Sequence, residues 1–144
     1  MLIILGGLPG TGKTISKQIA KQLKAAYLRV DTVECILKTK GPEGYDVCYA
    51  IAADNLKLGL HVVADSVNSI SITREAWRQV AQNANALFVE IELICSNKKI
   101  HQQRIESRKS DILGHSLPTW NEVLHREYEL WDTEPLIVDT AKYS

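Results

Sequence analysis

A short apolar run passes directly into a glycine-rich turn in the stretch Leu2-Ile3-Ile4-Leu5-Gly6-Gly7-Leu8-Pro9-Gly10-Thr11-Gly12-Lys13-Thr14. Residues 7–14 fit the pattern G-x-x-x-x-G-K-[ST], in which glycines let successive backbone N–H groups surround a phosphate. Apolar residues follow at helical spacing, namely Ile15, Ile19, Ala20 and Leu23. The stretch therefore predicts a strand, a phosphate-binding loop and a helix, in that order.

Each side chain at the end of this loop would have its own function in binding ATP. Lys13 would reach the β- and γ-phosphates of ATP, Thr14 would offer its hydroxyl to Mg²⁺, and the helix would turn its N-terminal dipole toward the anion. The dinucleotide fingerprint G-x-G-x-x-G/A fails at Ile15, which argues against a Rossmann dehydrogenase. The predicted nucleotide-binding residues are Gly7, Leu8, Pro9, Gly10, Thr11, Gly12, Lys13 and Thr14.

Length and composition narrow the class of protein. The 144 residues suit a single domain, and the 17 basic residues balance the 17 acidic ones, so nucleic acid is not an expected partner. The apolar start is too short for a signal peptide or a membrane span. Three widely spaced cysteines suggest free thiols in a reducing compartment, and we expect a cytoplasmic protein.

Two aspartates follow predicted strands. Residues 25–30 look like a strand ending at Asp31, and residues 61–64 look like one ending at Asp65. Ligands of open parallel sheets sit beyond the carboxyl ends of the strands, so both carboxylates should face the phosphate loop. We predict that Asp31 acts on an acceptor and that Asp65 supports Mg²⁺. The alternatives are a helix N-cap for Asp31, with Glu34, and a turn-organising role for Asp65.

Weaker acceptor-site candidates lie in two further segments. Residues 32–58 form a helical excursion between strands, in which Tyr45, Asp46 and Tyr49 could contact the acceptor, although a plain crossover helix would look the same. Arg74 falls in the first turn of a predicted helix, where a cation opposes the helix dipole. That position hints at a contact between Arg74 and the substrate or a phosphate.

A predicted lid covers residues 104–119. Arg104 and Arg108 lie four apart on one helix face and lead into a polar, glycine-containing segment, after which Thr119 and Glu122 predict a helix cap. The two arginines could neutralise charge on a transferred phosphoryl group, or they could belong to a solvated basic face.

The alternation of strands and helices predicts an α/β fold, a three-layer α/β/α sandwich around a parallel sheet of about five strands. The chain also resembles small phosphate-loop kinases, the predicted ATP-binding kinases grouped with chloramphenicol phosphotransferase, zeta-toxin-like kinases and polynucleotide 5′-kinases. The resemblance covers most of residues 1–144 and rests on residues 6–14, 29–31, 62–68, 104–108 and 136–139. It implies that Asp31 acts on the acceptor hydroxyl and that Arg104 and Arg108 grip the phosphates.

These observations favour an ATP- and Mg²⁺-dependent kinase of a small hydroxyl-bearing molecule. The connector at residues 39–44 is short, so the acceptor site could be small or completed by a second subunit, as in a homodimer. A nucleotide-binding regulator that hydrolyses ATP slowly is the alternative. A polynucleotide 5′-kinase is disfavoured by the zero net charge.

Overall fold

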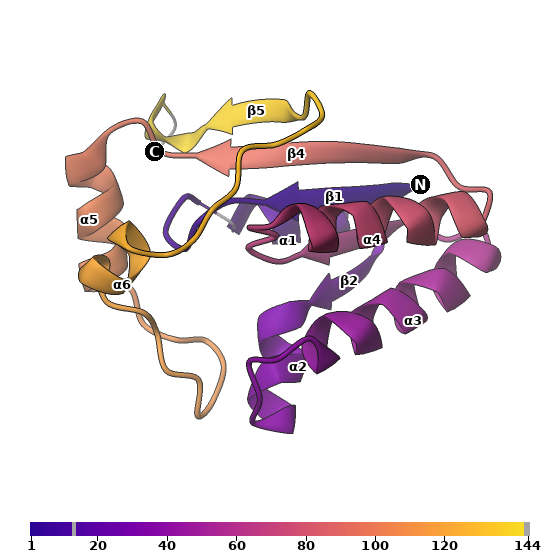
Figure 1. Ribbon diagram of the computed structural model, residues 1–144, viewed down its shortest axis with the longest axis horizontal. Helices are drawn as coiled ribbons and strands as arrows, with labels where there is room; N and C mark the ends of the chain where they lie inside the picture. Colours follow the sequence, from indigo (N-terminus) through magenta and orange to yellow (C-terminus); the bar gives the residue numbers. More distant parts are fainter. Residues whose placement is uncertain (13, 143–144) are drawn as a thin grey trace.

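The computed structural model describes residues 1–12 and 14–142. Its sheet has five parallel strands in the order β2-β3-β1-β4-β5 (Figure 1). The strands are β1 (Leu2–Gly6), β2 (Ala26–Arg29), β3 (Val62–Asp65), β4 (Phe88–Ile94) and β5 (Leu136–Asp139). The prediction of a parallel sheet of about five strands is confirmed.

Helices cover both faces of this sheet. The helices of the described residues are α1 (Thr14–Leu23), α2 (Val30–Leu37), α3 (Glu43–Lys57), α4 (Ser71–Asn83), α5 (Lys98–Ser107) and α6 (Trp120–Leu124), with a 3₁₀ turn, η1, at Thr140–Lys142. Figure 1 shows α3 and α4 in front of the sheet and α1 behind it. The fold is therefore the predicted three-layer α/β/α sandwich.

The central strand β1 is buried along its whole length because both of its faces are covered. Leu2 and Ile4 pack into one core with Trp77, which lies on α4. Ile3 and Leu5 point to the opposite face and pack with the α1 side of the sheet. An uninterrupted apolar strand of this kind holds the glycine-rich turn that follows it at the carboxyl edge of the sheet.

Strand register brings the chemically interesting residues together at that edge. Arg29, the last residue of β2, lies opposite Asp65, the last residue of β3. Strand β3 pairs in turn with β1, which leads into the glycine-rich loop. None of the helices formed within residues 14–142 is long and apolar enough to cross a membrane.

Candidate active site

A large cleft opens at the carboxyl edge of the sheet. Its volume is about 1450 Å³, and its walls come from the glycine-rich loop, α1, β2, α2, the start of α3, the end of β3, α5 and the segment that follows α5. Single ligand pockets usually measure about 300–1,000 Å³. The cleft therefore has room for a nucleotide together with a second substrate.

The glycine-rich loop is fixed by its own contacts and by α5. The Thr11 hydroxyl donates to the Leu8 carbonyl at 2.7 Å, and the Gly7 N–H donates to the Val67 carbonyl at 3.0 Å. Gly10 and Gly12 have positive φ angles of 80° and 96°, which side-chain-bearing residues rarely adopt. The turn thus requires glycine at both positions.

Close packing reinforces this requirement. A Cβ atom at Gly10 would meet Ile105 on α5, and one at Gly12 would meet Thr140. Pro9, Gly10, Gly12 and Thr14 line the cleft, whereas Gly7, Leu8 and Thr11 are not among its lining residues. Thr14 begins α1 and is exposed to the cleft, while Lys13 lies outside the described residues.

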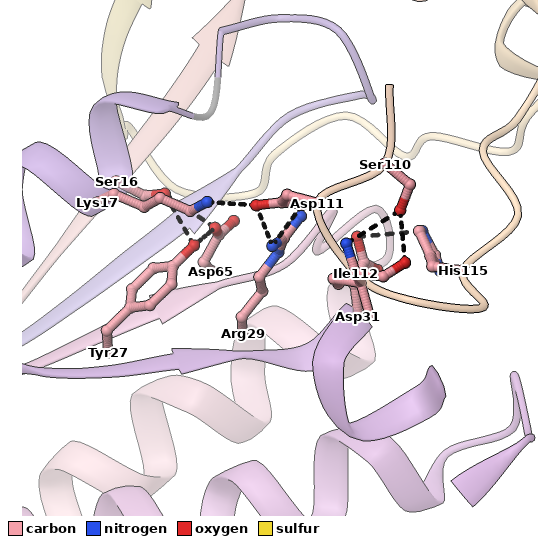
Figure 2. A network of polar contacts seen from close by, with 10 residues as sticks. All are labelled: Ser16, Lys17, Tyr27, Arg29, Asp31, Asp65, Ser110, Asp111, Ile112 and His115. Atoms are coloured by element: carbon pink, nitrogen blue, oxygen red, sulfur yellow. Dashed lines mark hydrogen bonds and ion pairs between the residues drawn. The ribbon is translucent and has the colours of Figure 1, made fainter. Parts of the chain in front are cut away.

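Asp65 is buried at the end of β3 and is held by two hydroxyl groups (Figure 2). Ser16 donates to its Oδ2 atom at 2.8 Å, and Tyr27 donates to the same oxygen. Burial, followed by the negative charge of Asp65, raises the pKa of Tyr27. Tyr27 therefore stays protonated as a hydrogen-bond donor to the carboxylate at neutral pH.

This arrangement fits a site for Mg²⁺. Among the described residues, both of these donors reach Oδ2, which leaves Oδ1 as the Asp65 atom that can accept a bond from a metal-bound water. Oxygen ligands together with retained waters are what Mg²⁺ requires. Thr14 supplies a hydroxyl in the same cleft. Within residues 1–12 and 14–142 there is no cluster of three or more His, Cys, Asp or Glu side chains that would hold a metal by itself.

Asp31 lines the cleft from the first turn of α2. The N-cap of α2 is Arg29, and no side chain caps this helix. Asp31 is therefore not the N-cap that the sequence allowed as an alternative. Its side chain is 44% exposed, and its Oδ2 atom lies 4.0 Å from His115 Nε2 (Figure 2). A partly exposed carboxylate at this place can approach a ligand in the cleft.

The two predicted lid arginines have different surroundings. Arg104 lies on α5 and donates from Nη1 to the Thr140 hydroxyl at 2.7 Å and from Nη2 to the Thr140 carbonyl at 2.9 Å. The Thr140 hydroxyl in turn donates to the Thr11 carbonyl at 2.5 Å. Arg104 is thus linked to the phosphate loop through one residue.

Arg108 follows α5 and lines the cleft. Its Nε atom is buried and has no hydrogen-bond partner in the described part of the chain. Burial lowers the pKa of Arg108; the negative charge of Asp31 opposes this, and the positive charge of Arg29 adds to it. Arg108 therefore lines the same cleft as Asp31 and Arg29, and one donor of its guanidinium is unsatisfied within the described residues.

The segment after α5, which we call the lid loop (residues 108–119), reaches across the cleft to α1, β2 and α2. Asp111 accepts from Lys17 Nζ at 2.5 Å, and its two oxygens lie 2.9 and 3.0 Å from Arg29 Nη1. These hydrogen bonds, led by that from Lys17, lower the pKa of Asp111 to about 2. The Cys35 thiol on α2 also donates to the Leu113 carbonyl at 3.4 Å.

We expect Asp111→Asn to loosen the lid loop and to speed modification of the Cys35 thiol by about 3–10-fold. The variant removes two partly exposed ion pairs, and each such pair contributes roughly 0–1 kcal/mol. The rate should be measured with a thiol reagent in a Cys95→Ser background, because Cys48 is buried and Cys95 is not. Asp132→Asn is the matched control, since Asp132 pairs with Arg78 at 3.7 Å and does not line the cleft. An unchanged rate in Asp111→Asn would show that Asp111 does not hold the loop.

The structure separates the four weaker acceptor candidates, of which Asp46 is exposed and does not line the cleft. Tyr45 lines the cleft, and its hydroxyl accepts from the Asn68 N–H at 3.1 Å. Tyr49 packs edge-on against Trp77 in the core, with ring centroids 4.6 Å apart. The prediction for Tyr49 is corrected, because a crossover helix places its inward side chains against the sheet rather than against a ligand.

The prediction for Arg74 is also corrected. Arg74 is fully buried and does not line the cleft. Its three nitrogens donate to the carbonyls of Asn68, Glu129 and Leu130, and its guanidinium lies 4.2 Å from the centre of the Trp131 ring. The unfavourable position in the helix dipole is offset by these backbone acceptors.

Several residues of the site have no distinctive local pattern in the sequence. Ser16 and Tyr27 hold Asp65, Lys17 and Arg29 hold Asp111, and Thr140 joins Arg104 to the phosphate loop. Of these residues, only Arg29 could be noticed in the sequence, because it lies just before Asp31 at the end of a predicted strand. The other pairings connect distant segments, as between Lys17 and Asp111, which are 94 positions apart.

Comparison with solved structures gives the same architecture. A protein named as a candidate kinase from Chloroflexus aurantiacus J-10-fl aligns with a TM-score of 0.76 at 24% identity, covering 96% of this chain and 87% of that one. The APS kinase CysC of Mycobacterium tuberculosis, solved with AMPPNP and APS, aligns with a TM-score of 0.66 at 16% identity, covering 96% and 87%.

A gluconokinase from Sinorhizobium meliloti 1021 aligns with a TM-score of 0.66 at 18% identity and covers 96% of this chain and 82% of that one. At these identities the likeness establishes the fold. The family model described as "AAA domain" matches residues 2–116, which is most of the sequence and includes the phosphate loop, both strand-end aspartates and both lid arginines. The chain therefore belongs to this AAA-domain family, in agreement with its resemblance to small phosphate-loop kinases.

Proposed function

We propose that this protein is a Mg²⁺- and ATP-dependent kinase that phosphorylates a hydroxyl group of a small molecule. The observation that supports this best is the two-sided cleft. Phosphate-loop residues line one side, and Asp31 and Tyr45 line the other, with Arg108 from the lid loop. A protein that only bound and hydrolysed ATP would not need space for a second substrate beside the phosphate loop.

In this proposal the loop amides, Lys13 and Thr14 bind the triphosphate. When bound, Mg²⁺ would neutralise charge that develops on the phosphate oxygens, and Thr14 and Asp65 would help to hold it. Asp65, fixed by Ser16 and Tyr27, would orient a metal-bound water. This half of the site positions the γ-phosphoryl group for attack.

Asp31 would accept the proton of the acceptor hydroxyl. The hydroxyl oxygen then forms a bond to the γ-phosphorus as the bond from that phosphorus to the β–γ bridging oxygen breaks, and ADP leaves. Positioning and electrostatic stabilisation provide most of the catalysis in such transfers. Arg108, with its buried Nε donor, would stabilise the charge on the transferred group.

We expect the two lid arginines to differ when each is replaced by alanine. Arg108→Ala should lower turnover by about 10²-fold with little loss of ATP-analogue affinity, because charge on the transferred group is met chiefly in the transition state. Arg104→Ala should weaken binding of the analogue, because Arg104 supports the phosphate loop through Thr140. Turnover and analogue binding should be measured for both.

Lys99→Ala is the matched control for this pair, since Lys99 is an exposed cation on the same helix. It should change neither quantity. Small and equal effects of Arg108→Ala on turnover and on binding would support the alternative, in which Arg108 belongs to a solvated basic face.

The direct test of the proposed function is whether release of ADP depends on an acceptor. The protein is incubated with Mg²⁺ and ATP, with and without a metabolite extract, and ADP is measured over time. A kinase should release ADP faster when the extract is present, and Lys13→Ala should abolish the increase. ADP release that is the same with and without extract would favour the regulatory ATPase instead.

A further inference from the structure

Two cations from different elements converge on one carboxylate of the lid loop. Lys17 comes from α1 and Arg29 from the end of β2, and both contact Asp111 within 3.0 Å (Figure 2). The Asp111 side chain is 51% exposed. An exposed carboxylate on a loop can be exchanged for another anion more readily than one buried in the core.

Arg108 is a further cation of this cleft, and one of its hydrogen-bond donors has no partner among the described residues. The Nε atom of Arg108 is buried without a hydrogen-bond partner in the described residues, and Arg108 lines the same cleft as Lys17 and Arg29. Burying an unpaired donor of a charged group costs free energy unless an acceptor fills the gap. Arg108 therefore adds positive charge to the cleft that Lys17 and Arg29 also line.

The balance of charged residues in the cleft also favours an anionic ligand. Its described lining residues include eight Lys or Arg and five Asp or Glu, although basic and acidic residues balance over the complete chain. Asp111 is one of those five acids and is carried by the lid loop. If the lid loop opened and withdrew Asp111, the excess of positive charge facing a ligand would increase.

We propose that Lys17 and Arg29 form an anion-binding subsite for the acceptor, and that Asp111 occupies it until an acceptor arrives. This inference rests on the proposed kinase function. Arg29 lies two residues before Asp31, so the anionic group would bind close to the carboxylate that receives the hydroxyl proton. The acceptor class is then a small hydroxylated molecule that also carries a carboxylate or a phosphate group.

The nucleotide is a poorer occupant for this subsite. Its phosphates are expected on the loop formed by residues 7–14, whereas Arg29 ends β2, on the other side of β3 from β1. Arg29 also neighbours the acceptor-side helix α2, whose Cys35 is covered by the lid loop. The subsite should therefore bind an anion when the phosphate loop is already full.

The test titrates inorganic phosphate, and separately acetate, into the protein saturated with Mg²⁺ and a non-hydrolysable ATP analogue. Binding is followed by NMR of the arginine Nε–H signals. Asp111→Asn should raise the affinity for at least one of the two anions by tenfold or more, because the internal competitor has lost its charge. Adding Arg29→Gln to this variant should remove the gain, and Asp132→Asn should behave as the wild type.

Each outcome decides the proposal. Tighter binding of phosphate than of acetate would identify a phosphate-bearing acceptor, and the reverse order would identify a carboxylate. Equal anion affinity in the wild type and in Asp111→Asn, or a gain that survives Arg29→Gln, would overturn the subsite. Failure of the ATP analogue to bind would instead refute the proposed kinase function, so the two failures are distinguishable.

Discussion

Asp31→Asn is expected to reduce phosphoryl transfer by about 10²–10⁴-fold while leaving affinity for a non-hydrolysable ATP analogue nearly unchanged. The range is the usual contribution of a general base. Asparagine keeps the size of the side chain but cannot accept the hydroxyl proton. Because Asp31 makes no N-cap of α2, the substitution should cost little stability beyond the roughly 0.3–1 kcal/mol of a first-turn charge.

Asp46→Asn is the matched control for this experiment. Asp46 lies in the first turn of α3, is exposed and does not line the cleft. Its substitution removes the same charge from the same kind of helical position, so transfer should be unaffected. Transfer at the wild-type rate in Asp31→Asn would remove Asp31 from the catalytic residues.

Arg74→Ala is expected to lower the free energy of unfolding by at least about 3 kcal/mol, because it would leave three carbonyl groups without their charged donor. It would also remove the contact between the guanidinium and the Trp131 ring. Unfolding in urea followed by tryptophan fluorescence gives this quantity. Arg74→Lys should recover only part of the loss, since lysine cannot match the planar fork of donors.

Glu75→Ala, at an exposed position next along α4, should stay within about 0.5 kcal/mol of the wild type. Below its melting temperature, Arg74→Ala should still bind the ATP analogue, because Arg74 lies outside the cleft. A stability loss below about 1 kcal/mol together with lost binding of the ATP analogue would instead support a role for Arg74 in ligand binding.

Much of the fold could be predicted because its signals are local. The apolar run before Gly6 predicts a strand, and the structure assigns β1 to Leu2–Gly6. The interval Thr119 to Glu122 predicts a capping box, which the structure contains at the start of α6. Such patterns depend on neighbours within one turn of a helix or one strand, so they can be recognised without knowledge of the tertiary structure.

Arg74 shows where local reasoning fails. Its first-turn position resembles that of a ligand-binding cation, but its acceptors belong to residues 68 and 129–130, and the latter are far along the chain. The irregular segment before β5 has no periodicity from which that contact could be inferred. The same limit applies to Asp111, whose partners on α1 and β2 become neighbours only when the lid loop crosses the cleft.

The positions of Asp31 and Asp65 at the cleft were predictable for a physical reason. In a parallel sheet all carboxyl ends lie at one edge, so an acid that follows an apolar strand reaches that edge whatever the strand order. The structure accordingly places both Asp31 and Asp65 in the lining of the cleft. Their roles in acceptor activation and metal binding remain predictions.

The most direct measurement follows the γ-phosphoryl group itself. The protein is incubated with γ-labelled ATP, Mg²⁺ and a metabolite extract, and the labelled products are separated. Our account predicts a newly labelled, phosphorylated organic compound that forms with the wild type and with Asp46→Asn but only slowly with Asp31→Asn. Label found only in inorganic phosphate, released at the same rate with and without the extract, would contradict it.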